Sequence, residues 1–221
     1  MKKVAFIPIK MNNERLPNKN TKAFDNGKPL IYYILKTLEK VKELDEVYVY
    51  CSDESIKKFL PKSVKFLKRD PYLDKSTTPF NDVLTYFAKD IDADVYVLTH
   101  ATAPFIKSES ISKGLNKVLS GEYDSALSVK KMQEFIWKDN KPFNYDINNI
   151  PRTQDLEEMY VETCGLYVYT REVISNKRRI GDKPYLVEVS DIEAVDINNH
   201  IDFEIANCIY NSIIKESNLS D

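Results

Sequence analysis

The sequence predicts an α/β fold, in which a mostly parallel central sheet lies between two layers of helices. Two observations lead to this class. Short apolar runs that fit buried strands alternate with segments of helical periodicity, and consecutive strands joined by helices pair in parallel. The 221 residues are 43% hydrophobic and 30% charged, which is ordinary for a globular protein and excludes general disorder.

In the first quarter of the chain, two strands and two helices alternate. Lys3–Ile9 is almost entirely apolar, as a strand buried on both faces would be. Proline is favoured in the first turn of a helix, so a helix is expected from Pro29, with one apolar face: Leu30, Ile34, Leu38 and Val41. Glu46–Cys51 is rich in β-branched and aromatic residues and predicts a strand. Ser52-Asp53 then fits the cap of a short helix over Glu54–Leu60.

The same alternation continues to residue 119. Val64–Leu67 predicts a short strand, and Thr78–Asp90 predicts a helix. Asp94–Thr99 is the next buried strand. A helix follows over Lys107–Leu119, for which Ser108 is the expected cap.

The alternation breaks between Lys131 and Tyr160, after a strand at Asp124–Val129. This segment has many turn signals and no helical period, so we expect an arm that protrudes from the domain at about residues 131–160.

The last elements return to the domain. Glu162–Tyr169 and Leu186–Val189 predict strands, and His200–Lys215 predicts a closing helix with isoleucines on one side: Ile201, Ile205, Ile209 and Ile213. No repeat or linker interrupts the chain. We therefore expect residues 1–221 to form a single domain, a Rossmann-like three-layer sandwich with a protruding arm.

Net charge, hydropathy and cysteine content argue against several kinds of partner and cellular location. The net charge of −2 offers no basic field for nucleic acid, and no window approaches the roughly 20 apolar residues of a membrane span. Three cysteines without a CxxC pair favour a reducing compartment. The apolar run at the N-terminus is too short for a signal peptide. We expect a cytoplasmic protein that binds neither nucleic acid nor membranes.

The loop after the first strand carries the main functional signal. Lys10, Arg15 and Lys19 follow a buried strand and precede a helix, at the sheet edge where ligands of parallel sheets bind. Three cations there suit a polyphosphate, although a solvated charged loop is the plainer alternative. Asn12 and Asn13 stand where phosphate loops use glycine, and asparagine also tolerates the left-handed conformation.

Part of this loop resembles a known family. Arg15-Leu16-Pro17, Lys19-Asn20 and Gly27-Lys28-Pro29 are similar to the opening of the acylneuraminate cytidylyltransferases, which include the CMP-sialic acid synthetases. The first half departs from the family pattern, with Lys10 for its arginine and Met11-Asn12-Asn13 for its Gly-Gly-Ser. The resemblance implies that the loop, including Lys10, Asn12, Asn13 and Asn20, binds the nucleotide.

Further segments resemble the family in the same order. Arg69-Asp70-Pro71, with Ser76, is similar to the segment near the nucleoside. His100 stands where the family has a glutamine that touches the sugar, and Thr102 follows it. Arg152, Gln154 and the strand from Glu162 resemble a later element. The resemblance implies that the sugar contacts are His100, Thr102, Arg152 and Gln154.

The last of these segments implies a metal site. Asp196-Ile197-Asn198 resembles the Asp-Ile-Asp metal motif of the family, with one carboxylate replaced by an amide. Mg²⁺ prefers oxygen ligands and takes one or two carboxylates together with substrate phosphates. The resemblance thus implies that Asp196 and Asn198 hold Mg²⁺ or Mn²⁺. The alternative is that one of them only caps the last helix.

The resemblance implies a reaction. CMP would pass from CTP to the anomeric hydroxyl of a 2-keto sugar acid, pyrophosphate would be released, and the product would serve surface polysaccharide biosynthesis. The catalytic residues would be Lys10, Arg15, Lys19 and Asp196. The family dimerises through such an arm, so a homodimer is implied. A nucleotidyltransferase with another NTP or a non-keto acceptor, or a relative that binds nucleotide without turnover, remains an alternative.

Overall fold

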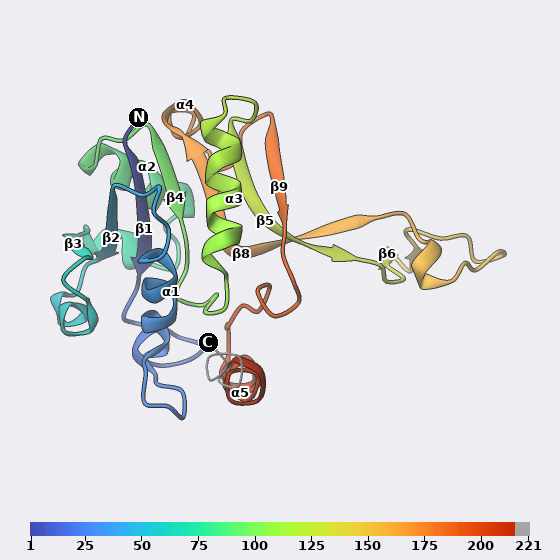
Figure 1. Ribbon diagram of the computed structural model, residues 1–221. Helices are drawn as coiled ribbons and strands as arrows, with labels where there is room; N and C mark the ends of the chain where they lie inside the picture. The colour runs from blue at the N-terminus through green and yellow to red at the C-terminus, as the bar shows by residue number, and fades with distance from the viewer. Residues whose placement is uncertain (215–221) are drawn as a thin grey trace.

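A seven-stranded sheet forms the centre of the protein in the computed structural model, which describes residues 1–214 (Figure 1). Its strands are β1 (Lys3–Ile9), β2 (Glu46–Cys51), β3 (Lys65–Lys68), β4 (Val95–Leu98), β5 (Ser125–Met132), β8 (Met159–Thr170) and β9 (Pro184–Glu188). Their order is β3-β2-β1-β4-β8-β5-β9. Only β8 runs antiparallel to its neighbours, β4 and β5, within this sheet. The predicted mostly parallel sheet is thus confirmed.

Helices cover both faces of the sheet, as a three-layer sandwich requires. α1 (Leu30–Leu38) and α3 (Ser108–Leu119) bury apolar side chains against one face. α2 (Phe80–Asp90) and the short α4 (Arg171–Ser175) pack on the other. The predicted apolar face of α1 is buried: Leu30, Ile34 and Leu38 are each at most 1% exposed. No helix among residues 1–214 has both the length and the apolar character needed to cross a membrane.

Local interactions shift several predicted boundaries. The predicted helix over residues 78–90 begins two residues later, at Phe80, because Pro79 takes an extended conformation at the cap position. Residues 54–59 form a 3₁₀ helix rather than an α-helix, although Asp53 caps it as predicted by accepting a hydrogen bond from the Ser55 N–H. The prediction that Ser108 caps α3 is wrong. Lys107 occupies the cap position, and Ser108 is the first helical residue.

The last helix is capped by a residue that was not expected. α5 (His200–Ile209) begins after Asn199, whose side chain accepts from the Asp202 N–H, while the Asp202 carboxylate accepts from the Asn199 N–H. The interpretation that Asp196 or Asn198 is the cap is therefore wrong. A π-helical turn, Tyr210–Ile214, follows α5, and the predicted end at Lys215 lies outside the described residues.

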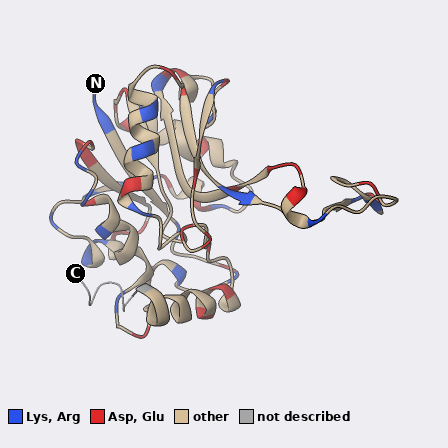
Figure 2. Ribbon diagram, turned by 45° about the vertical axis from the view of Figure 1, so that its right-hand side comes forward, with Lys and Arg blue, Asp and Glu red and all other residues tan. Residues whose placement is uncertain are grey.

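An arm extends β5 and β8 beyond the body of the molecule (Figure 1). The two strands pair as far as Met132 and Met159. A small hairpin follows, made of β6 (Trp137–Lys138) and β7 (Lys141–Pro142). Its two turn residues have positive φ, as a tight hairpin turn requires. We use "arm" for residues 133–158. Both acidic and basic residues lie along it, as they do over the body (Figure 2).

A bulge interrupts β8 beside the functional edge of the sheet. The pairing with β5 shifts between Leu127 and Val129, so residues 163–165 bulge out of register. The Ser128 hydroxyl secures this bulge because it accepts hydrogen bonds from the Leu166 N–H (2.9 Å) and the Thr163 hydroxyl (2.6 Å). The bulge redirects the backbone carbonyl of Cys164.

Candidate functional site

Three loops meet at the carboxyl edge of the parallel strands. They follow β1 (residues 10–29), β4 (residues 99–107) and β9 (residues 189–199). A small apolar core holds them together, and its members come from all three loops, from the first residue of α1 and from α5: Leu16, Phe24, Leu30, Phe105, Ile197, Phe203 and Ala206. Burial of these side chains fixes the polar residues that lie next to them in the sequence, notably Arg15 beside Leu16 and Asp196 beside Ile197.

The three predicted cations converge on one cavity. Lys10, Arg15 and Lys19 line a cavity of about 300 Å³, together with Asn13, Glu14, Leu16 and Asn198. These residues come from loops almost 190 positions apart in the chain, so the fold gathers them. The three cations outnumber the one carboxylate, Glu14, and give the cavity the character of an anion site.

Two hydrogen bonds tie the cationic loop to residues 196–198. Arg15 Nη2 donates to Asn198 Oδ1 at 2.9 Å, and Lys19 Nζ donates to the Ile197 carbonyl at 2.9 Å. The Ile197 N–H in turn donates to the Thr102 carbonyl at 2.9 Å. The predicted nucleotide-binding loop and the predicted metal-binding segment are therefore one unit.

Asp196, beside the cavity residue Asn198, has one unpaired carboxylate oxygen. Its Oδ2 accepts a hydrogen bond from Asn198 Nδ2 at 2.8 Å. Its Oδ1 is buried and, among the described residues, has no hydrogen-bond partner, a property shared only with Thr99 Oγ1. A buried carboxylate oxygen without a partner is costly. Asp196 therefore fits the role of a ligand to a hard cation, whereas the Asn198 oxygen is already bound to Arg15.

The Lys19 ammonium is half-buried, which perturbs its protonation. Burial lowers the pKa of Lys19 most, and the positive charge of Arg15 lowers it too. The negative charges of Asp196 and Asp202 act in the opposite direction. Lys19 is therefore a poorly solvated cation, and an anion bound in the cavity would interact with it more strongly than with an exposed lysine.

The asparagines of the loop have different surroundings. Asn20 is 6% exposed and donates to the Lys10 carbonyl at 2.9 Å, so it shapes the loop from within. Asn12 is exposed, and it lies outside the set of residues that lines the cation cavity. The left-handed conformation is found at Asn18, with φ of 55°, and not at Asn12 or Asn13. The roles of Asn12, Asn13 and Asn20 in nucleotide binding stay predictions, and for Asn20 the geometry gives an internal role.

His100 lies at the end of β4 with a defined tautomer. Its Nδ1 lies 2.9 Å from the Cys164 carbonyl at the β8 bulge. A carbonyl only accepts, so Nδ1 carries the proton and Nε2 is left as an acceptor in the neutral ring. Burial lowers the pKa of His100 most and Arg179 and Lys19 lower it further, while the Cys164 bond and Asp196 raise it. His100 is thus close in space to the cationic loop.

Two residues predicted near the nucleoside differ in accessibility. The Arg69 side chain is 3% exposed and forms an ion pair with Asp74, whose other oxygen accepts from Ser52. This pair stabilises the loop after β3, and a direct contact with a nucleotide would require it to open. Ser76 is exposed on the same loop. Both predicted contacts stay predictions.

The structure does not bring Arg152 and Gln154 to the cavity. Both lie in the arm, where Arg152 forms a bidentate pair with Asp155 at 2.7 and 3.0 Å. The Gln154 carbonyl accepts from Gln133 at 3.3 Å, again within the arm. In a single chain these two residues are separate from His100 and Thr102.

Sequence reasoning missed one charged residue close to His100. Arg179 follows α4 in a polar turn, and its guanidinium lies 4.0 Å from the centre of the Tyr167 ring. The turn has no periodic pattern, so the sequence carried no signal that would bring Arg179 to this place.

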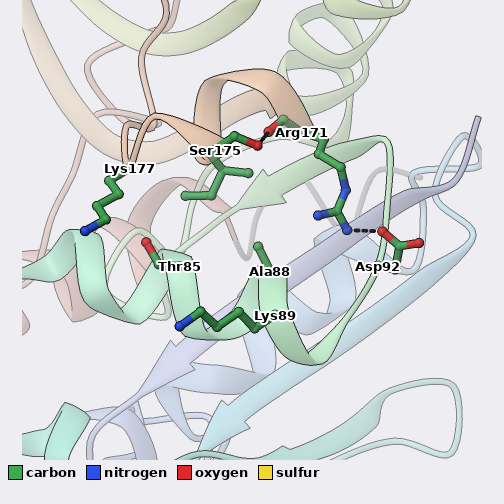
Figure 3. Close-up of a pocket in the computed structure, with 8 residues that line it drawn as sticks. Thr85, Ala88, Lys89, Asp92, Arg171, Ser175 and Lys177 are labelled. Atoms are coloured by element: carbon green, nitrogen blue, oxygen red, sulfur yellow. Dashed lines mark hydrogen bonds and ion pairs between the residues drawn. The ribbon is translucent and has the colours of Figure 1, made fainter.

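A second cavity lies at the opposite edge of the sheet, between α2 and α4 (Figure 3). It measures about 410 Å³, and its lining includes Lys89, Arg171 and Lys177. The Arg171 guanidinium there is paired with Asp92. Because this cavity lies at the amino ends of the parallel strands, it is remote from the cationic loop.

Comparisons with known proteins agree with this geometry. The family model for cytidylyltransferases matches residues 4–192. An N-acylneuraminate cytidylyltransferase of Oncorhynchus mykiss is 28% identical over 91% of this chain and 49% of its own length. A 3-deoxy-manno-octulosonate cytidylyltransferase of Hydrogenovibrio crunogenus is 25% identical over 91% of this chain and 88% of its own. This chain thus spans about half the length of the fish relatives.

Solved structures share the fold at low identity. A CMP:2-keto-3-deoxy-manno-octonic acid synthetase solved with CTP superposes with a TM-score of 0.70, at 14% identity, over 96% of this chain and 99% of that one. A 4-diphosphocytidyl-2C-methyl-D-erythritol synthase of Anaerococcus prevotii gives 0.71, also at 14% identity, over 95% and 96%. These structures show the shared fold. The family model that matches residues 4–192, most of the chain, identifies it as a member of the cytidylyltransferase family.

Proposed function

We propose that the protein transfers CMP from CTP to the anomeric hydroxyl of a 2-keto sugar acid and releases pyrophosphate. The observation that carries this proposal is the junction of the two loops: Arg15 and Lys19 bind residues 197–198 beside the unpaired oxygen of Asp196. The positively charged side chains that suit a triphosphate thus lie next to a carboxylate oxygen that suits a divalent metal ion. Relatives named for N-acylneuraminate and octulosonate support a keto-sugar acid as the acceptor.

The chain's residues act mainly by position and charge. The acceptor oxygen attacks the α-phosphorus of CTP, the bond from that phosphorus to the bridging oxygen breaks, and pyrophosphate leaves. The acceptor hydroxyl loses its proton to solvent water in the same conversion. Lys10, Arg15 and Lys19 hold the triphosphate and neutralise the charge that grows on the departing pyrophosphate. His100 and Thr102 face the acceptor and orient its hydroxyl.

A divalent cation fits the same site. Among residues 1–214, no group of three or more His, Cys, Asp or Glu side chains forms a ready metal centre. A Mg²⁺ or Mn²⁺ ion would therefore depend on Asp196, with Asn198 beside it, and on phosphate oxygens of the substrate. Once bound, it would supply charge neutralisation at the reacting phosphate.

We also propose that the active form is a homodimer joined by the arms. Large apolar side chains are exposed along the arm: Phe135, Trp137, Phe143, Ile147 and Ile150. Exposure of several large apolar side chains on one extension supports a protein interface there. The Arg152 side chain is 71% exposed, and Asp155 of the same arm is its ion-pair partner. An exchanged arm would bring this exposed cation to the site of the other copy.

Pyrophosphate release tests the proposed function. Each NTP would be supplied with Mg²⁺ and one acceptor at a time: N-acetylneuraminate, 3-deoxy-manno-octulosonate or its 8-amino-8-deoxy form. We expect release with CTP only, and only when a keto-sugar acid is present. Turnover with another NTP, or with an acceptor that lacks the keto acid, would replace the proposal with a different nucleotidyltransferase. Tight CTP binding without release under any condition would indicate a relative without turnover.

A further inference from the structure

Glu162 and Arg179 form a pair beside His100 that the nucleotide site does not use. Arg179 Nη2 donates to Glu162 Oε1 at 2.9 Å. Their side chains are 41% and 29% exposed, respectively, so the pair is partly open to solvent. Glu162 lies on β8 just before the bulge, and Arg179 lies in the turn after α4. The pair therefore joins two elements at the edge of the sheet where the acceptor would bind.

Aromatic rings hold the Arg179 guanidinium in one orientation. It lies 4.0 Å from the centre of the Tyr167 ring and 5.5 Å from that of Phe80. The His100 ring shares both neighbours, at 5.7 Å from Phe80 and 6.4 Å from Tyr167. Arg179 and His100 are therefore parts of one wall built on the same two rings. The fixed guanidinium also loses little entropy when it binds a ligand.

Unused hydrogen-bonding groups remain on both members of the pair. The Tyr167 hydroxyl and Arg179 both bind Glu162 Oε1, and within residues 1–214 the other carboxylate oxygen, Oε2, accepts no hydrogen bond. Likewise Nε and Nη1 of Arg179 donate to no described residue. One hydrogen-bond acceptor, Glu162 Oε2, and two donors, Arg179 Nε and Nη1, are thus unpaired within the described residues, next to the Tyr167 and Phe80 rings.

The charge balance of the pair indicates what it binds. Glu162 already neutralises Arg179, so the pair offers no net charge to an anionic group. Adjacent donors and acceptors above aromatic rings suit the hydroxyl or acylamino substituents of a sugar, which both donate and accept. The cationic loop has the opposite character and suits phosphates.

We infer that Glu162 and Arg179 form a specificity-determining subsite, which binds hydroxyl or acylamino substituents on the sugar ring or side chain of the acceptor. This inference rests on the proposed function, because it assigns a part of the acceptor to this wall. Arg179 donates to a substituent oxygen, and Glu162 Oε2 accepts from a substituent O–H or N–H.

Substitutions at the two positions test the subsite. Arg179→Met keeps the length and apolar stem but removes every donor. Glu162→Gln keeps an oxygen for Tyr167 and Arg179 and replaces the unused acceptor with an NH₂ group, so folding is preserved even if Arg179→Met proves unstable. The matched control is Arg178→Met. Arg178 is the neighbouring arginine, and it binds Asp182 and the Gly181 carbonyl within its own turn.

The readout is discrimination between acceptors. kcat/KM is measured for the best keto-sugar acid and for its analogues that lack one hydroxyl or acylamino group. For the wild type, we expect removal of one of these groups from the acceptor to lower kcat/KM by about tenfold or more. The reason is that polar groups of the subsite then lose their hydrogen-bond partner. Arg179→Met and Glu162→Gln should erase that preference, raise the acceptor KM about tenfold and leave the CTP KM unchanged. Arg178→Met should keep the preference.

The possible failures are distinguishable. Wild-type turnover in which both variants keep the full preference for the parent acid overturns the subsite and leaves the proposed function standing. An equal loss in Arg178→Met also overturns it, since the effect would then belong to the turn as a whole. The absence of wild-type pyrophosphate release with every keto-sugar acid overturns the proposed function, and the subsite with it.

Discussion

Lys19 is the loop cation whose surroundings restrict it most. Its ammonium is half-buried and donates to the Ile197 carbonyl, so it acts from a fixed, poorly solvated position. We predict that Lys19→Met lowers kcat/KM for CTP by roughly 100-fold, because a preorganised charge-stabilising donor is lost. Steady-state pyrophosphate release measures this. Lys28→Met, which removes a lysine from the same loop outside the cavity, serves as control, and equal losses in both variants would contradict a specific role.

Asn198 places an amide, and not a second carboxylate, beside Asp196. Asn198→Asp would place a second carboxylate where an amide now donates to Asp196 at 2.8 Å. We predict that the apo variant loses roughly 1–4 kcal/mol of stability through repulsion, and that Mg²⁺ restores it. The Mg²⁺ concentration for half-maximal activity should fall by about tenfold, because ligand charge sets affinity.

Thermal unfolding and activity across an Mg²⁺ titration measure both effects. Asp196→Asn is the companion variant and should lose most of its response to Mg²⁺. An Asn198→Asp protein that responds to Mg²⁺ as the wild type does would count against a metal at this site.

His100 should make stability depend on pH below its ordinary pKa of 6.5. Burial lowers the pKa of His100 in the folded state, so the unfolded chain takes up the proton first as the pH falls. The unfolded state then binds more protons, and the free energy of unfolding decreases below pH 6.5 until the folded His100 also titrates. His100→Gln should lose this part of the pH dependence. Urea unfolding between pH 5 and 8 measures it, and the exposed His200→Gln should retain it.

The sequence indicated the place of charged residues that directly follow a strand, but not of residues that tertiary packing brings in. Lys10, Arg15 and Lys19 were expected at one edge of the sheet because they follow β1, and they line one cavity there. Arg69 forms an ion pair with Asp74 that no sequence pattern indicated, and its contact with the nucleoside stays a prediction. Arg179 was missed because only the tertiary packing of Tyr167 brings it to the site.

Among the elements, β8 carries the bulge that connects the buried core with the candidate site. The Ser128 hydroxyl is fully buried and secures the bulge through Leu166 and Thr163. We predict that Ser128→Ala costs about 1–3 kcal/mol, because buried donors lose their acceptor. The acceptor KM should also rise, since the bulge presents the Cys164 carbonyl to His100.

Urea unfolding and acceptor kinetics measure these two effects. The exposed Ser120→Ala, at the end of α3, should change stability by less than about 0.5 kcal/mol. A Ser128→Ala protein with wild-type acceptor kinetics would mean that the bulge has no influence on His100.

The regular elements were predictable because their patterns are local. Alternating strands and helices set the three layers, and the turn signals after residue 131 indicated where the chain leaves them. The direction of β8 was not predictable, since Glu162–Tyr169 would read as a buried strand in either orientation. The bulge was also hidden, because Cys164 and Gly165 fit an ordinary strand and only Ser128, on another strand, holds them out of register.

At the scale of the whole molecule, the arm should determine the oligomeric state. Trp137 and Ile150 are 56% and 63% exposed in the single chain, which is unfavourable for large apolar groups unless another surface covers them. We predict that Trp137→Ser combined with Ile150→Ser converts a dimer into a monomer, as measured by light scattering. Ile201→Ser on α5, where the side chain is 69% exposed, should leave the dimer intact. A wild-type monomer at micromolar concentration would contradict the arm as an interface.

The place of β8 in the sheet also sets the order in which the protein can be completed during synthesis. β4 pairs with β1 on one side, but its other neighbour is β8, which is translated after the whole arm. β5 likewise pairs only with β8 and β9 among the described strands, and both come later in the chain. A nascent chain that has not yet reached residue 159 therefore carries an open strand edge in the middle of its future sheet, the kind of edge that invites misassociation. This edge is covered only after β8, the strand that follows the arm, has been synthesised and has paired with β4 and β5.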